Sequence, residues 1–283
     1  MPIVEANGID ICYEELGSPD DPCLLLVTGF KGQLTAFRPE LCALFAKQGL
    51  RVVRFDNRDS GLSSKTPADV PFSLETPPYT VADMALDAVG LLDALGIEAA
   101  HVVGVSMGGI IAQSLAIDHP SRVLTMASIM STTGDTTVGG ATPEAEAAAL
   151  APVPEGRTAA IQHHVDVHQL VSGPHFDEAQ TREDATVAFD RSNYPQGGMY
   201  QVIAVMADGD RTERLAGVSC PTVVIHGAVD PLVNVSGGEA TAKAIPGAEL
   251  VVVPDMGHEL PPALFPQLVD AVIRNIRRGS QVE

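Results

Sequence analysis

Two hydrophobic patterns alternate along most of the chain. Short continuous apolar runs are typical of strands covered on both faces, and they occupy residues 23–27, 51–56, 100–105, 123–131, 221–226 and 249–253. Longer stretches with apolar residues at helical spacing occupy residues 35–49, 108–118, 235–245 and 262–277. Strands that alternate with helices at this rhythm predict an α/β fold with a mostly parallel, twisted sheet flanked by helices.

Two local signals add detail to the first part of the chain. Residues 2–16 alternate around Asn7-Gly8, which predicts a β-hairpin with a tight turn. Thr80 is followed three positions later by Asp83, the spacing at which two side chains cap the first turn of a helix. The inner side of that helix carries Met84, Ala88, Leu91, Leu92 and Leu95.

The alternation of strand and helix stops between residues 133 and 216. This stretch has Ala-rich and acidic segments of helical character, broken by Gly and Pro, with no convincing buried strand. We therefore expect residues 1–132 and 217–283 to form the core, with residues 133–216 inserted as a helical cap. The cap carries 13 acidic and 5 basic residues, which disfavours strongly anionic substrates that need Arg or Lys.

Composition limits the partners and the compartment. The chain has 283 residues, 45% of them hydrophobic, and a net charge of −19. Nucleic acids and anionic membranes need a basic surface, so neither is an expected partner. No targeting segment or membrane-spanning run is evident, so we expect a cytoplasmic protein. Reduced and mostly buried thiols are expected at Cys12, Cys23, Cys42 and Cys220.

The candidate nucleophile lies where a predicted strand passes into a predicted helix. Ser106 is the centre of a G-x-S-x-G motif that includes Gly104 and Gly108. In a nucleophile elbow the serine adopts a strained conformation, and the flanking glycines let strand and helix pass closely. The Met107 N–H at the start of the helix would then be free to bind an oxyanion.

A serine hydroxyl needs a base and a group that orients the base. His258 follows the last apolar run, and Asp230 follows the run before it, so both can reach the carboxyl edge of the sheet. The chain order Ser, acid, His is that of the α/β-hydrolase plan. Asp135 is a rival acid, and Asp255 ranks lower because it is too close to His258 in sequence.

Other residues complete the candidate site. The Phe30 N–H, in the loop after residues 23–27, is the expected partner of Met107 in an oxyanion hole. The predicted substrate pocket contains Met130, Tyr194, Tyr200 and Leu232. A metal site at His163, His164 and His168 is disfavoured because no further ligand lies nearby, and neither a metal nor a cofactor is expected.

Together these motifs resemble the α/β-hydrolase superfamily over nearly the whole chain. The chain is most similar to the bacterial carboxylesterase group that includes aclacinomycin methylesterases and mycobacterial LipG-like esterases. The resemblance implies a nucleophile at Ser106, an acid at Asp230 and a base at His258, with oxyanion donors at Phe30 and Met107. Two positions depart from the usual pattern: Thr28 where many relatives have His, and Asp59 where Gly is commoner.

The resulting hypothesis is a serine carboxylesterase that hydrolyses a neutral, hydrophobic ester, including a methyl ester, through an acyl-enzyme. A cofactor-free perhydrolase and a C–C bond hydrolase with the same triad are the alternatives. A ligand receptor that lacks catalysis is a third alternative, which the complete triad disfavours because simple binding does not require one. The expected partner is a small-molecule ester, and the oligomeric state stays open.

Overall fold

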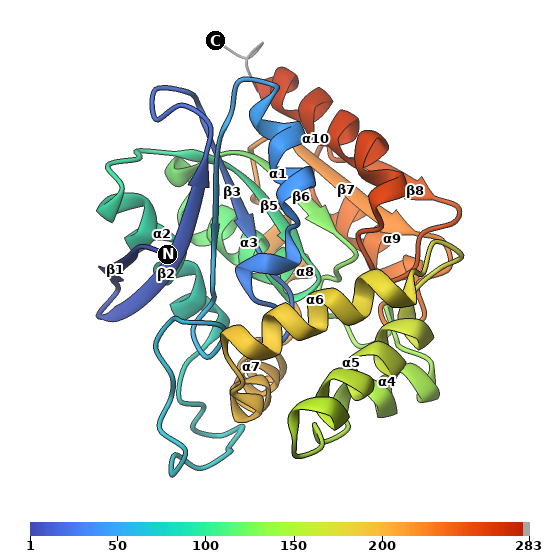
Figure 1. Cartoon of the computed structure of the whole chain (residues 1–283). Coiled ribbons are helices and arrows are strands. Elements are labelled where there is room, and N and C mark those ends of the chain that lie inside the picture. Colours follow the sequence, from blue (N-terminus) through green and yellow to red (C-terminus); the bar gives the residue numbers. More distant parts are fainter. Residues whose placement is uncertain (280–283) are drawn as a thin grey trace.

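An eight-stranded sheet runs through the middle of the computed structural model, which describes residues 1–279 (Figure 1). In chain order the strands are β1 (Ile3–Ala6), β2 (Ile9–Leu16), β3 (Cys23–Val27), β4 (Arg51–Phe55), β5 (Ala100–Val105), β6 (Val123–Ile129), β7 (Thr222–Gly227) and β8 (Glu249–Val253). Their order across the sheet is β1-β2-β4-β3-β5-β6-β7-β8. The β1–β2 and β2–β4 pairs are antiparallel. The six strands β4, β3, β5, β6, β7 and β8, which follow one another across the sheet, are parallel. The predicted α/β fold is confirmed.

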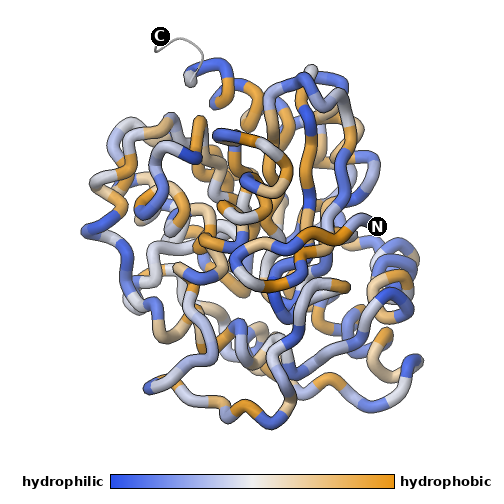
Figure 2. The backbone as a smooth tube through the Cα atoms, turned by 90° about the vertical axis from the view of Figure 1, so that its left-hand side faces the viewer, coloured by the Kyte–Doolittle hydropathy of each residue, from blue (hydrophilic) through white to orange (hydrophobic). Residues whose placement is uncertain are grey.

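Helices cover both faces of the sheet. The core helices are α1 (Pro39–Ala46), α2 (Val81–Ala94), α3 (Met107–Asp118), α9 (Val235–Ala244) and α10 (Phe265–Gly279). Short 3₁₀ turns occupy Leu34–Ala36, Pro120–Arg122 and Pro262–Leu264. One apolar cluster joins the sheet to α2 and α3, and a second joins it to α1 and α10. In Figure 2 many apolar segments of the backbone run through the interior of the molecule, and hydrophilic segments are common along its outer edge.

Most predicted elements are observed, with small differences at their ends. The predicted helix at 35–49 is a 3₁₀ turn followed by α1, because Pro39 begins a new helix and Gly49 has a φ of +79°. Thr80 and Asp83 form the predicted capping box at the start of α2. The strand predicted at 123–131 ends at Ile129, because Met130 has a φ of +44° that breaks the extended backbone.

Between β6 and β7 the chain forms five further helices, which we call the α4–α8 segment. They are α4 (Pro143–Leu150), α5 (Arg157–Val171), α6 (Glu178–Arg191), α7 (Pro195–Asp208) and α8 (Thr212–Leu215). In Figure 1 the helices α4 to α7 gather at one end of the sheet. Within residues 133–216 the structure has no strand.

The strand register sets the position of the site. Val27 pairs with Gly104, Val105 pairs with Ile129, and Ile129 pairs with Ile225. The carboxyl ends of β3, β5, β6 and β7 therefore lie side by side, and the loops that follow them meet at one edge.

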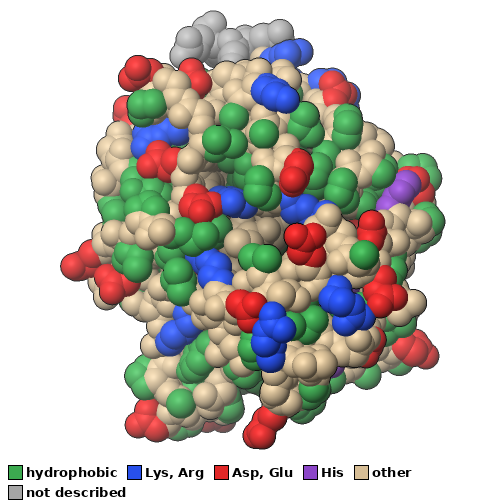
Figure 3. Space-filling view, viewed as in Figure 1, with side chains coloured by type: hydrophobic (Ala, Val, Ile, Leu, Met, Phe, Trp, Pro, Cys, Tyr) green, Lys and Arg blue, Asp and Glu red, His purple; other side chains and the backbone are tan. Residues whose placement is uncertain are grey.

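The surface gives no sign of a single strong charge patch on the side drawn in Figure 3. Acidic and basic side chains are interspersed there with apolar and polar ones. None of the helices within residues 1–279 is long and apolar enough to cross a membrane.

Candidate active site

Ser106 occupies a strained turn between β5 and α3. Its φ of 56° and ψ of −120° are rare for a residue with a side chain. The Ser106 N–H donates to the Ile129 carbonyl at 2.8 Å, which ties the turn to β6. A Cβ atom at Gly104 would overlap the Gly108 carbonyl, and one at Gly108 would overlap the Val27 carbonyl. Both glycines are therefore required for the close passage of strand, helix and loop.

The structure brings Ser106, His258 and Asp230 together as a hydrogen-bonded chain. His258 Nε2 lies 2.9 Å from Ser106 Oγ, and His258 Nδ1 lies 2.7 Å from Asp230 Oδ2. A carboxylate can only accept a hydrogen bond, so we assign the imidazole proton to Nδ1. Nε2 is then an acceptor for the serine hydroxyl, which is the arrangement that general-base activation requires.

Backbone N–H groups hold the Asp230 carboxylate in place beside the His258 imidazole. Its Oδ1 accepts the N–H groups of Leu232 at 2.9 Å and Val233 at 2.8 Å, and the residue is buried. His226 Nε2 binds the Val233 carbonyl at 2.7 Å, and burial lowers the pKa of His226. A neutral His226 therefore supports the Asp230 turn without adding a competing charge.

The two rival acids have other partners. Asp135 Oδ1 accepts the N–H and the hydroxyl of Thr137, both at 2.8 Å, so it stabilises its own turn. Asp255 Oδ2 lies 2.6 Å from His175 Nε2, and this hydrogen bond lowers the pKa of Asp255. Asp230 is the carboxylate that the structure places on the His258 ring.

The predicted oxyanion donors flank the serine. Met107 is the first residue of α3, where the N–H has no intrahelical acceptor. Phe30 follows Gly29, and a Cβ built on Gly29 would lie 3.1 Å from the Ser106 Cβ, so this loop runs directly beside the serine. Lys31, with a φ of 58°, donates its N–H to Gln201 Oε1 at 2.9 Å, which holds the loop against α7.

The end of α5 binds the loop that carries His258. The His258 N–H donates to the Val171 carbonyl at 2.7 Å, and the Gly173 N–H donates to Glu259 Oε1 at 2.7 Å. The Asp255–His175 pair links the same two loops. The sequence pattern does not predict these contacts. The signal that could have pointed to them is the presence of two acidic residues, Asp255 and Glu259, close to the candidate base.

The four predicted pocket residues have different surroundings. Met130 is buried directly after β6, and Leu232 is half-buried in the Asp230 turn. The hydroxyl of Tyr194 binds the Thr66 carbonyl at 2.5 Å, and that of Tyr200 binds the Val70 carbonyl at 2.8 Å. Both tyrosines thus join α7 to the loop before α2, and a pocket role for the four residues stays a prediction.

The four cysteines are free thiols, and burial raises the pKa of all four. Residues 1–279 contain no group of three or more His, Cys, Asp or Glu side chains arranged to hold a metal ion. His163, His164 and His168 all lie on α5, where His164 and His168 stack on each other.

Comparisons with known proteins agree with the observed fold. The profile of a family described as alpha/beta hydrolase fold matches residues 22–261. Rhodomycin D methylesterases from Streptomyces sp. (strain C5) and Streptomyces peucetius are 27% and 28% identical, and each alignment covers 98% of both chains. The solved meta-cleavage product hydrolase from Pseudomonas fluorescens IP01 has a TM-score of 0.80 at 20% identity, over 98% of both chains.

Proposed function

The chain belongs to the alpha/beta hydrolase fold family, and from this premise we propose that it is a serine carboxylesterase. The single observation that carries the proposal is the hydrogen-bonded chain from Ser106 through His258 to Asp230. Each of its three groups has the neighbour that nucleophilic catalysis on a carbonyl requires.

In the proposed reaction, Ser106 Oγ forms a bond to the ester carbonyl carbon while its proton moves to His258 Nε2. The carbonyl oxygen becomes an oxyanion that the N–H groups of Phe30 and Met107 bind. Collapse of this intermediate breaks the bond to the alcohol, which leaves with the proton from His258. Water then attacks the acyl-enzyme by the same steps and releases the acid.

Asp230 has two tasks in this scheme. Its hydrogen bond keeps the proton of neutral His258 on Nδ1, and its charge stabilises the imidazolium that forms in each half-reaction. The two backbone N–H groups that bind Oδ1 fix the carboxylate in the required orientation. The oxyanion donors contribute separately, because loss of one such donor typically lowers turnover by about 10²–10³.

We further propose that residues 133–216 act as a cap and that the substrate is a neutral ester. All five arginines of this stretch are paired with carboxylates of the protein, at Asp190, Glu178, Asp56, Asp208 and Asp118. These guanidinium groups are therefore already neutralised and offer little to an anionic substrate. The similarity to two methylesterases supports a methyl ester as the group that is cleaved.

A fluorophosphonate probe and a set of methyl and 4-nitrophenyl esters test the proposal. We expect the probe to label Ser106 and to abolish ester hydrolysis in proportion to labelling. The Ser106→Ala variant should remain folded, resist labelling and lose hydrolysis, whereas Ser18→Ala, at an exposed turn, should behave as wild type. Full ester hydrolysis by Ser106→Ala would refute the proposal.

A further inference from the structure

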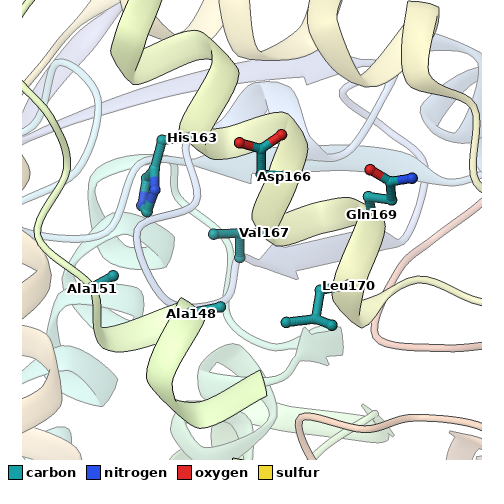
Figure 4. A pocket seen from close by; sticks show the side chains of 7 residues that line it. All are labelled: Ala148, Ala151, His163, Asp166, Val167, Gln169 and Leu170. Carbon is teal, nitrogen blue, oxygen red and sulfur yellow. The ribbon is translucent and has the colours of Figure 1, made fainter. Parts of the chain in front are cut away.

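Helix α5 has two sides with different surroundings. One side faces a groove of about 530 Å³ beside α4, which Figure 4 shows from close by. The side chains that line this groove belong to Ala148, Ala151, His163, Asp166, Val167, Gln169 and Leu170. The buried residues of α5 are Ala160, Ile161, Val165 and Val171. At 3.6 residues per turn, His164 and His168 project from this second, inward side.

The two inward imidazoles form a stacked pair. Their ring centroids lie 4.2 Å apart, with an angle of 25° between the planes. Burial is the main cause that lowers the pKa of His164 to about 4 and that of His168 to about 3. Both rings are therefore neutral near pH 7, and each offers one N–H donor and one nitrogen acceptor.

The pair lies close to both halves of the candidate active site. Both histidines lie on the same side of α5 as Val171, whose carbonyl accepts the His258 N–H at 2.7 Å. Lys31, which follows Phe30 in the predicted oxyanion loop, donates from Nζ to the Ala149 carbonyl of α4 at 3.1 Å, and α4 packs against α5. The stacked rings thus lie on a helix that contacts the loop of the candidate base directly and the oxyanion loop through α4.

Both histidines are half-buried, and their ring nitrogens are not enclosed away from solvent. Among residues 1–279, none of the four ring nitrogens has a hydrogen-bond partner. The ring nitrogens are therefore free to bind a ligand with suitable polar atoms.

We propose that His164 and His168 are substrate-binding residues whose ring nitrogens bind a hydroxyl or carbonyl oxygen that the ester carries away from its reacting carbonyl. The inference rests on the proposed esterase function and adds a substrate class to it. The preferred substrate is a neutral ester with such an oxygen substituent on a skeleton that can lie against the stacked rings. An ester of the same skeleton without the oxygen lacks these hydrogen bonds and reacts more slowly.

Three methyl esters of one skeleton test this specificity: methyl 3-phenylpropanoate and its 3-hydroxyphenyl and 4-hydroxyphenyl counterparts. For wild type we expect kcat/KM to be about tenfold higher for at least one hydroxylated ester than for the parent, because a site with polar partners discriminates against a substrate that lacks them. His164→Phe and His168→Phe keep an aromatic ring of similar size and remove the nitrogens. Each should reduce the preference, and the double variant should abolish it, so that the ratio of kcat/KM between the hydroxylated and parent esters falls to about one.

His163→Phe is the matched control, because His163 lies on the same helix but lines the outer groove (Figure 4). This variant should keep the wild-type preference. The inference is overturned if wild type shows no preference for either hydroxylated ester, or if the double variant keeps it.

A binding measurement separates this inference from the esterase proposal. In the Ser106→Ala protein, the imidazole proton NMR signals of His164 and His168, assigned with the two Phe variants, should shift when a hydroxylated ester is added. Shifted signals together with no hydrolysis by wild type would refute the esterase and retain the binding site. Normal hydrolysis without any shift would refute the binding site and retain the esterase.

Discussion

Two members of the candidate triad, Ser106 and His258, are held in place by different parts of the molecule. Ser106 is fixed from within the core, by β5, α3 and the close approach of the β3 loop at Gly104 and Gly108. His258 lies on a loop that receives contacts from both the core and the α4–α8 segment, through Asp230 and Val171. The candidate nucleophile therefore depends on the integrity of the sheet, whereas the candidate base also depends on the position of α5.

Substitutions in the two regions should therefore have different effects. A change in the α4–α8 segment should move the loop of the candidate base without disturbing the elbow. A change at the elbow affects the fold itself. The variants below test the comparison, beginning with the largest expected effect.

The first test removes the charge of Asp230, on which His258 depends most directly. Asp230→Asn should lower kcat by about 10⁴, because an amide that donates to His258 favours the wrong tautomer and does not stabilise the imidazolium. The stability and the KM should change much less than kcat. Ester hydrolysis under saturating substrate, together with urea unfolding, checks this. A decrease smaller than about tenfold would show that another carboxylate orients the base.

The second test places a methyl group in the elbow. Gly108→Ala should destabilise the protein by about 3 kcal/mol or more, because the new Cβ would overlap the Val27 carbonyl and the backbone has no room to yield. Gly140→Ala is the control, since a Cβ there meets nothing within 4 Å. Urea unfolding of both variants measures the effect. Equal stability would contradict the view that the core fixes the serine.

The sequence predicts the core better than it predicts the α4–α8 segment, and the reason is physical. Strands β3, β5 and β8 coincide with the apolar runs at 23–27, 100–105 and 249–253, because strands buried on both faces have continuous apolar sequences. The triad residues follow such strands, and parallel pairing brings strand ends to one edge.

The remaining features depend on contacts between segments that are distant in sequence. The bond from His258 to Val171 uses backbone atoms on both sides, so no residue type signals it. His164 and His168 interrupt the apolar side of α5, and their spacing shows that they share a side without showing what that side faces. Their place on a helix that contacts the loop of the candidate base follows from tertiary packing alone.

The third test uses low pH to measure how a buried histidine in the sheet affects the stability of the core. His101 is buried in β5 with its Nδ1 at 3.0 Å from Thr125 Oγ1, and burial lowers its pKa from 6.5 to about 4. The unfolded chain then binds more protons than the folded chain between these two pH values, so the free energy of unfolding falls as the pH falls through this range.

The contribution of His101 to this loss should be about 3 kcal/mol at most. In His101→Asn, unfolding by urea at pH 7 and at pH 4.5 should therefore differ less than it does in wild type. His119→Asn, at a half-exposed position after α3, is the control and should keep the wild-type difference. An unchanged difference in His101→Asn would mean that His101 does not set the acid response of the sheet.

The smallest expected effect comes from the contact between α5 and the base loop. Glu259→Ala removes the acceptor of the Gly173 N–H, while Glu259→Gln keeps an oxygen in the same place. One such hydrogen bond is worth about 1 kcal/mol, so kcat/KM for a 4-nitrophenyl ester should fall about fivefold in the Ala variant and recover in the Gln variant. The unfolding free energy should change by less than about 1 kcal/mol, because the glutamate is half-exposed and the core is untouched. If activity and stability instead fall together, and Gln rescues neither, then α5 supports the fold as a whole and the base is not positioned separately from the serine.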